Sequence, residues 1–198
     1  ADIEGRRRPV ADALKDWGLA HRFAGSGDRA AIGNIVYDAL RMKLSHAWLM
    51  DDDSASSLAY AVLLRQWGKS FEALAAEFEG DKFAPAAPDA EKQQAFLCRS
   101  LTEAPAYIQG DIPEWVQTSF ETAFGERWLT EAQALNERPT LDLRANTLKA
   151  TRDKVLKALE ESGAEATQIA RQGVRIPAGR GPSRLPNVTA ELSFQKGW

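Results

Sequence analysis

The hydrophobic pattern of this 198-residue chain changes at Pro139, and this change limits the possible folds more than any other feature. Before it, apolar residues recur three and four positions apart, as in "DRAAIGNIVYDALRMK", where Ile32 and Val36 fall on one stripe. After it, "LDLRA" alternates apolar and polar residues. The first spacing is typical of amphipathic helices and the second of half-buried strands. We therefore expect a mainly α protein, with an all-helical domain over residues 1–138 and a small α/β module over residues 139–198.

The first part is expected to be helical throughout. Helices are predicted over residues 9–22, 28–42, 44–50, 54–67, 70–79, 88–101, 113–124 and 126–136. Four of them have a side chain suited to capping the helix start, namely Asp28, Ser54, Ser70 and Asp89.

The second part reads as a β-α-β pattern. A strand begins at Leu141, and a helix over residues 151–162 follows, with Thr151 as its cap and Gly163 at its end. Shorter β-like pieces cover residues 165–171, 173–178 and 189–194. Such a module is small for a core of its own. The aromatic end of the chain at Trp198 adds to the expectation that the module is incomplete and the protein truncated.

Several classes of protein are excluded by composition. No apolar run approaches the roughly 18 residues that a membrane helix needs. The arginine-rich start is not followed by the apolar core of a secretory signal. A single cysteine, Cys98, rules out an internal disulfide. We expect a cytoplasmic monomer that does not contact a membrane.

Catalytic and metal-binding motifs are weak in this sequence. "LLRQWGKS" ends like a phosphate loop but has Leu63 where the first glycine is required. His21 and His46 have no acidic or cysteine partner at zinc-ligand spacing. Cys98 is expected to be buried on an apolar helix stripe, where a thiol is inert. We therefore expect no catalytic, cofactor-binding or metal-binding residue in these 198 residues.

The charge distribution favours binding to an anion. Residues 1–50 carry 8 Lys and Arg against 6 Asp and Glu, residues 51–139 carry 7 against 16, and residues 140–198 carry 10 against 6. Basic side chains at both ends could contact phosphates. The candidates are Arg29, Arg41 and Lys43 around one helix, and Arg144, Asn146 and Lys149 at the end of the predicted strand. For Arg41 and Lys43, a favourable interaction with the helix dipole is an equally good explanation. Arg152, Lys154 and Lys157 could equally form a solvated helix face.

Three segments carry a resemblance to a known family. "GSGDRAAIGNIVYDALRMKLS" contains Asp28, Arg29, Tyr37 and Arg41 in the order found in NusB-like RNA-binding domains. "RPTLDLRANTLKATRDKVLKALEESG" contains an R-x-N-T-L-K segment, and "FQKGW" ends the chain. Together they resemble the N-terminal part of bacterial ribosomal RNA cytosine-5 methyltransferases of the Sun/Fmu type.

The resemblance implies a NusB-like RNA-binding domain, an RRM-like α/β module, and then a methyltransferase domain that is missing here. The parent enzyme would use S-adenosylmethionine and act on RNA, expected to be 16S ribosomal RNA, through a cysteine nucleophile. Its two cysteines and its cofactor loop would lie beyond residue 198, and Cys98 matches neither cysteine. The chain itself would then contribute substrate recognition.

Two alternatives remain open at this point. The chain could be a stand-alone NusB-like RNA-binding protein in antitermination or ribosome assembly. It could also be a helical protein-interaction domain whose acidic middle binds a basic partner.

Overall fold

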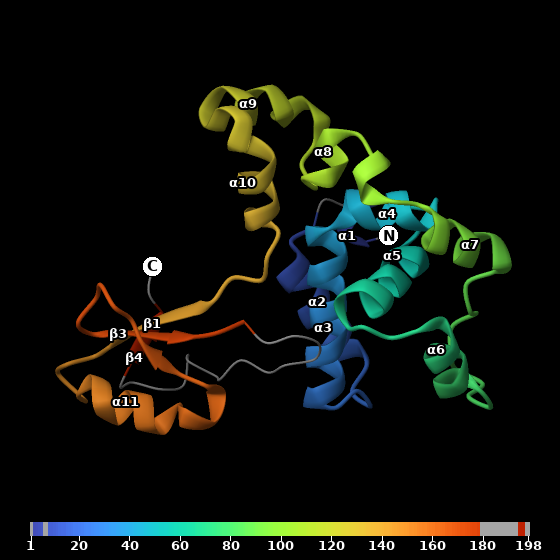
Figure 1. Ribbon diagram of the computed structural model, residues 1–198. Helices are drawn as coiled ribbons and strands as arrows, with labels where there is room; N and C mark the ends of the chain where they lie inside the picture. Colours follow the sequence, from blue (N-terminus) through green and yellow to red (C-terminus); the bar gives the residue numbers. More distant parts are fainter. Residues whose placement is uncertain (1, 6–7, 179–193, 197–198) are drawn as a thin grey trace. The chain divides into compact units, whose positions relative to one another are not determined.

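The computed structural model describes residues 2–5, 8–178 and 194–196 (Figure 1). The chain divides into two compact units, Ala1–Glu137 and Arg138–Trp198. Among the described residues, the first unit is helical and the strands all lie in the second. The predicted fold class, mainly α with a small α/β module, is confirmed. Among the helices that the structure describes, none is both long and apolar enough to cross a bilayer.

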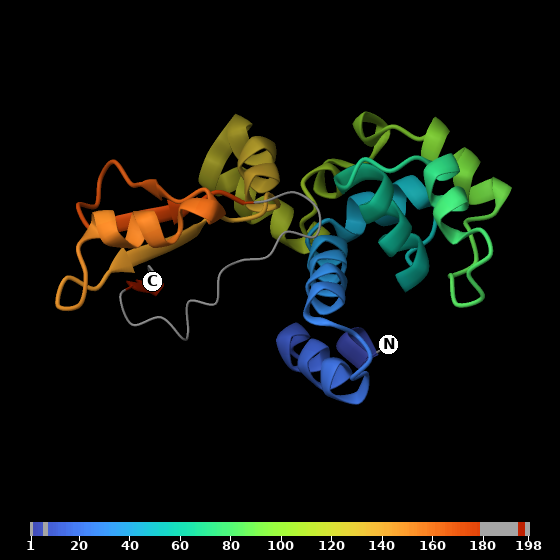
Figure 2. The same cartoon turned by 90° about the horizontal axis from the view of Figure 1, so that it is seen from below.

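The helical unit is built from short helices joined by turns and loops (Figures 1 and 2). In chain order they are α1 (Asp2–Gly5), α2 (Val10–Ala20), α3 (Ser26–Arg41), α4 (Lys43–Met50), α5 (Ala55–Ala61), the π-helix η1 (Val62–Gln66), α6 (Phe71–Phe78), α7 (Ala90–Cys98), η2 (Leu101–Glu103), α8 (Ala106–Gln109), η3 (Glu114–Val116), α9 (Gln117–Phe124), η4 (Gly125–Arg127) and α10 (Trp128–Leu135). Sequence reasoning missed α1 and α8, because four residues are too few to show a helical period.

In the helical unit, side-chain caps fix three of the predicted helix starts. Ser54 accepts a hydrogen bond from the Ser57 N–H at 3.3 Å, and Ser70 and Asp89 cap α6 and α7 in the same way. The predicted cap at Asp28 was wrong, since α3 begins two residues earlier. The Asp28 carboxylate instead reaches back to accept the Gly25 N–H at 2.8 Å. A carboxylate on the third helical residue bonds the N–H that precedes the helix.

The core of the helical unit forms where α4, α5, η1 and α6 meet. Its buried residues are Met50, Tyr60, Ala61, Leu64 and Leu74. Helix α7 joins this core only at its edge, through Phe96, whose ring meets Phe71 edge-on at 5.7 Å. Cys98 is exposed, so its predicted burial was wrong. Two residues along a helix turn the side chain by about 200°, so Cys98 points away when Phe96 points inward.

The α/β unit is a four-stranded sheet with one helix against it. Its elements are β1 (Leu141–Ala145), α11 (Arg152–Ala158), η5 (Glu160–Ser162), β2 (Glu165–Ala166), β3 (Gly173–Ile176) and β4 (Phe194–Lys196). The strand order is β2-β3-β1-β4, and every neighbouring pair is antiparallel. The chain leaves β1 through α11 to β2 and then returns between them as β3, which is the split β-α-β arrangement of ferredoxin-like units.

The last predicted strand is described only in part. Of residues 189–194, all but Phe194 lie outside the described residues, as do Gly197 and Trp198 of the "FQKGW" segment. Strand β4 pairs with β1 so that Phe194 lies opposite Ala145 and Gln195 opposite Arg144.

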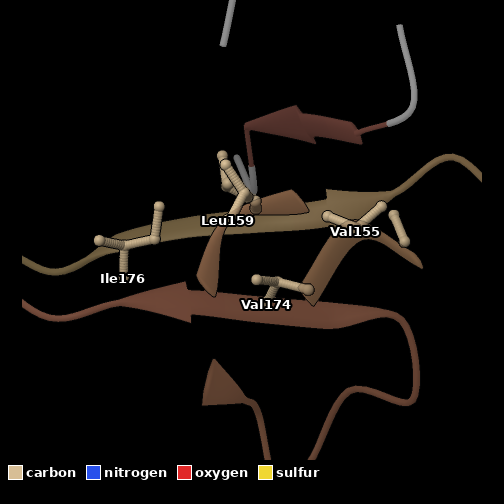
Figure 3. Packing of buried hydrophobic residues seen from close by; sticks show 6 residues of the cluster. Val155, Leu159, Val174 and Ile176 are labelled. Atoms are coloured by element: carbon tan, nitrogen blue, oxygen red, sulfur yellow. The ribbon is translucent and has the colours of Figure 1, made fainter. Parts of the chain in front are cut away.

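One apolar cluster joins α11 to the sheet (Figure 3). Val155 of α11 and Leu159, which follows the helix, pack against Leu143, Val174 and Ile176 of the two central strands, and each is at most 7% exposed. Leu143 of β1 thus packs against the helix that follows it, with the partly buried Leu141 beside the cluster. Since α11 covers one face of the sheet, the residues that alternate with this cluster must face the other way.

Candidate nucleic-acid interface

The face of the sheet that α11 does not cover carries charged side chains. In β1, Leu143 is buried, and its neighbours Asp142 and Arg144 belong to the opposite face. In β3, Val174 is buried and Arg175 is exposed. The predicted alternation of β1 therefore holds, with Arg144 on the outward side.

Arg175 and Asp142 are direct cross-strand neighbours on this face. The Arg175 Nε donates to Asp142 Oδ1 at 2.6 Å, and Nη2 donates to Oδ2 at 2.8 Å. These hydrogen bonds hold the pKa of Asp142 below its usual range. A two-point contact of this kind fixes the plane of the guanidinium as well as its position.

A groove of about 740 Å³ lies over this face. It is lined by residues 142–144 of β1, by the segment 165–173 and by Arg175. The segment folds tightly, since Thr167 Oγ1 donates to the Ala170 carbonyl at 2.9 Å and the Thr167 N–H bonds the Gly173 carbonyl at 3.1 Å. A Cβ at position 173 would lie 2.0 Å from Thr167 Oγ1. The loop can approach β3 this closely only because residue 173 is glycine.

Three arginines line the groove, Arg144, Arg171 and Arg175, against the two acidic residues Asp142 and Glu165. Guanidinium groups present planar, fixed donors that match phosphate and carboxylate oxygens. Sequence reasoning missed Arg171 and Arg175. The alternation in "GVRI" could have placed Arg175 on an outward face, but only the pairing of β3 with β1 brings it beside Asp142 and Arg144.

Asn146 and Lys149 lie in the turn that follows β1. The Asn146 Oδ1 accepts the Leu148 N–H at 3.2 Å, and its carbonyl accepts the N–H groups of Lys149 and Ala150 at 2.8 and 2.9 Å. Asparagine commonly closes turns in this way. The structure thus gives Asn146 a role in shaping the turn, and it leaves Lys149 exposed.

Arg29 lies near the start of α3 and connects it to the preceding helix. Its Nε donates to the Ala24 carbonyl at 2.9 Å, and a Cβ on Gly18 of α2 would lie 3.4 Å from its Cδ. The side chain is nevertheless exposed. Among the described residues, no carboxylate pairs with it.

Arg41 and Lys43 lie at the opposite end of α3. The Arg41 Nη1 contacts Asp38 Oδ1 at 2.7 Å, and the Asp38 side chain is 6% exposed. Lys43 begins α4 and is half-buried. Twelve residues of helix separate Arg29 from Arg41, which corresponds to roughly 18 Å along the axis. The structure therefore does not bring these candidates into one cluster.

A partly buried polar cluster surrounds Ser45 and His46 near the start of α4. The Ser45 N–H donates to Asp111 Oδ1 at 2.8 Å, and Arg65 Nη1 donates to Ser45 Oγ at 2.7 Å. His46 is fully buried, and neither of its ring nitrogens has a hydrogen-bond partner in the described part of the chain. Burial, followed by the charge of Arg65, lowers the pKa of His46 from 6.5 to about 4. We interpret Ser45 and His46 as part of the interior of the helical unit.

The sheet of the α/β unit does not have the arrangement that binds nucleotide-containing cofactors such as S-adenosylmethionine in α/β proteins. Nucleotide-containing cofactors in α/β proteins bind in a crevice at the carboxyl ends of parallel strands, beside a glycine-rich turn. The strand pairs of this sheet are all antiparallel. The turns after β1 and before α11 contain no glycine.

Comparison with known proteins agrees with this topology. Residues 112–180 match the family described as Methyltr_RsmF/B-like, ferredoxin-like domain. The match includes α9 and α10 as well as β1, α11, β2 and β3. The three groove arginines all fall within it.

Curated relatives carry the name ribosomal RNA small subunit methyltransferase B. The protein of Cronobacter sakazakii is 36% identical over 88 residues, which cover 43% of this chain and 19% of the relative. That of Pectobacterium carotovorum is 28% identical over 110 residues, covering 54% and 23%. A probable member from Synechocystis sp. is 32% identical over 96 residues, covering 46% and 20%.

The matched segments thus span about a fifth of the length of these relatives. They confirm the predicted resemblance, since about half of the chain is similar to ribosomal RNA small subunit methyltransferases B, and residues 112–180 match a ferredoxin-like domain described for RsmF/B-like methyltransferases.

Proposed function

We propose that this chain is the RNA-recognition region of an S-adenosylmethionine-dependent methyltransferase that acts on cytosine carbon 5 of 16S ribosomal RNA. The observation that carries the proposal is the groove with its three arginines, inside the segment that matches the RsmF/B-like family. In this proposal the catalytic cysteines and the cofactor belong to a domain outside these 198 residues. The cytoplasmic location and the monomeric state also remain predictions.

The chemistry of the groove favours contacts to the RNA backbone. None of the residues that line it is aromatic, so stacking of bases on side-chain rings has no support there. Arg144, Arg171 and Arg175 offer donors to phosphate oxygens, and Lys149 adds a positive charge at the same end of β1. Phosphate contacts position an RNA without reading its sequence. We therefore propose that the α/β unit holds the RNA and contributes little base specificity.

The helical unit would supply a second set of contacts as a NusB-like domain. Its candidates are the exposed Arg29 at one end of α3 and Arg41 with Lys43 at the other. Because Arg41 already bonds the buried Asp38, its loss should affect folding as well as binding. Arg29 is the better probe of RNA contact in this unit, since its only hydrogen bonds within the described residues are to the local backbone.

The proposal is tested by binding of the 198-residue chain to a fragment of 16S ribosomal RNA and to transfer RNA at the same salt concentration. We expect the helical unit, and not the groove, to make the ribosomal fragment bind at least about tenfold more tightly. The double variant Arg144→Ala, Lys149→Ala should weaken both complexes and lower the salt slope by at most about two counterions. Equal affinity for the two RNAs would remove ribosomal RNA as the substrate. No measurable binding to either would overturn the proposal.

A further inference from the structure

Three aromatic rings form a corner where α2 ends and the loop to α3 begins. The Trp17 and His21 rings are stacked, with centroids 4.5 Å apart and an interplanar angle of 13°. The Phe23 ring lies nearly perpendicular to the His21 ring, with centroids 5.7 Å apart and an interplanar angle of 82°. The His21 Nδ1 lies 2.8 Å from the Trp17 carbonyl oxygen, which fixes the ring between its two neighbours. The corner is therefore held in place by its own contacts.

Phe23 is 84% exposed although it belongs to this ordered arrangement. Exposing a phenylalanine forgoes roughly 1.5–3 kcal/mol of burial free energy. The next residue, Ala24, is buried, so the chain enters the protein interior directly after Phe23. A ring that is held against His21 and still open to solvent presents a flat apolar surface to a ligand.

Two arginines lie beside the corner, and Asp16, which precedes Trp17, is paired with Arg8. Arg22 precedes Phe23, and the exposed Arg29 is anchored on Ala24 and Gly18. Within the described residues, neither arginine pairs with a carboxylate. Asp28, the third residue of α3, already accepts a hydrogen bond from the Gly25 N–H. An apolar ring flanked by two cations is complementary to a base with its phosphates, and less so to an apolar protein surface.

We propose that Phe23 stacks on an unpaired base of the bound RNA, while Arg22 and Arg29 contact the phosphates on either side of it. This inference rests on the proposed function and assigns to the helical unit a preference for single-stranded RNA. Bases within a duplex are stacked on each other and cannot be reached by a side-chain ring. The helical unit would thus distinguish single-stranded from duplex RNA, while the groove of the α/β unit contacts phosphates.

The chain contains a matched control for Phe23. Phe83 is 82% exposed, but Lys82 Nζ lies 4.8 Å from the centroid of its ring. Its neighbours in sequence include Glu79 and Asp81, which repel phosphate. Replacing either phenylalanine with alanine therefore removes a phenyl ring of nearly equal exposure from the protein surface.

The test measures binding of the 198-residue chain to a fluorescent 12-nucleotide oligouridine, whose bases are unpaired, and to a 12-base-pair RNA duplex. Phe23→Ala should weaken oligouridine binding by about five- to a hundredfold and leave duplex binding unchanged. Phe23→Trp should keep the affinity, and Phe83→Ala should have no effect. The salt slope should stay the same in Phe23→Ala and fall by about 0.7 in Arg22→Gln.

The outcomes distinguish a failure of the base-stacking inference from a failure of the proposed function. An unchanged oligouridine affinity in Phe23→Ala would overturn base stacking, and would make the corner a candidate contact for protein. In that case the proposed function survives if the Arg144→Ala, Lys149→Ala variant still weakens RNA binding. If the wild-type chain binds no RNA at all, both the inference and the proposed function fail. Circular dichroism of Phe23→Ala should match the wild type, because the ring is exposed.

Discussion

Arg175 holds Asp142 across the two central strands through two hydrogen bonds, of 2.6 and 2.8 Å. Both side chains are about half exposed, so solvent and ligands can reach the pair. An arginine that is already bound to a carboxylate is less available to a phosphate. The pair therefore competes with RNA for one of the three arginines of the groove.

Replacing Asp142 with asparagine should raise the affinity for RNA by about two- to fivefold. The change removes one negative charge from the groove and releases the Arg175 guanidinium. The cost in stability should stay within about 1 kcal/mol, because the pair is exposed. RNA titration and urea unfolding measure the two effects. Asp153→Asn on α11, on the covered side of the sheet, is the control and should leave RNA affinity within twofold. A loss of affinity in Asp142→Asn would show that the ion pair orients Arg175 for binding.

Replacing Gly173 with alanine should destabilise the α/β unit by about 1–3 kcal/mol. The new Cβ would meet Thr167 Oγ1 at 2.0 Å and the Ala170 Cβ at 3.0 Å. The loop 167–172 must then move away from β3, which also deforms the groove. Thermal unfolding and RNA titration should both report the change.

A double-mutant cycle separates the clash from other effects of Gly173→Ala. Thr167→Ala removes the hydroxyl that the new methyl group meets, so the double variant should recover part of the lost stability. The recovery should be incomplete, because the Thr167 hydroxyl also bonds the Ala170 carbonyl. If the two losses are simply additive, the close contact is not the cause of the destabilisation.

The helical unit should lose stability as the pH falls from 6.5 toward 4. The pKa of His46 is 6.5 in an unfolded chain and about 4 when folded, so the unfolded state binds the proton more readily. The contribution of neutral His46 is complete above pH 6.5 and decreases by up to about 3 kcal/mol as the pH reaches 4. The positive charge of Arg65 further disfavours protonated His46, whereas the negative charge of Asp38 favours it.

Comparing variants separates the contribution of His46 to the pH dependence of stability from the contribution of the carboxylates. In His46→Leu, the free energy of unfolding should depend less on pH between 6.5 and 4 than in the wild type. Identical pH profiles for the wild type and His46→Leu would exclude His46 as the cause.

Local patterns in the sequence predicted much of the fold. Helical spacing located the long helix that became α3, and Ser54, Ser70 and Asp89 marked true helix starts. The alternation in residues 141–145 predicted both the strand and its buried side. These features depend on a few neighbouring residues, which is why they can be read without tertiary information.

The groove could not be predicted in the same way. Arg175 is 31 residues from Arg144 in sequence, and the two come together only because β3 pairs antiparallel with β1. The loop that carries Arg171 approaches the sheet through a contact that depends on Gly173 and Thr167. The exposure of Cys98 likewise depends on which side of α7 packs against Phe71. Each of these features follows from packing between distant segments, which periodicity does not encode.

The most direct test of the account is the salt dependence of RNA binding in two triple variants with equal loss of charge. One replaces Arg144, Arg171 and Arg175 of the groove with glutamine, and the other replaces Arg152, Lys154 and Lys157 of α11. Helix α11 covers the opposite face of the sheet, so its charges should not contact the RNA. We predict that the slope of log K against log salt concentration falls by about two in the groove variant and stays unchanged in the α11 variant. Equal slopes in the two variants would contradict the assignment of the groove as the RNA-binding face.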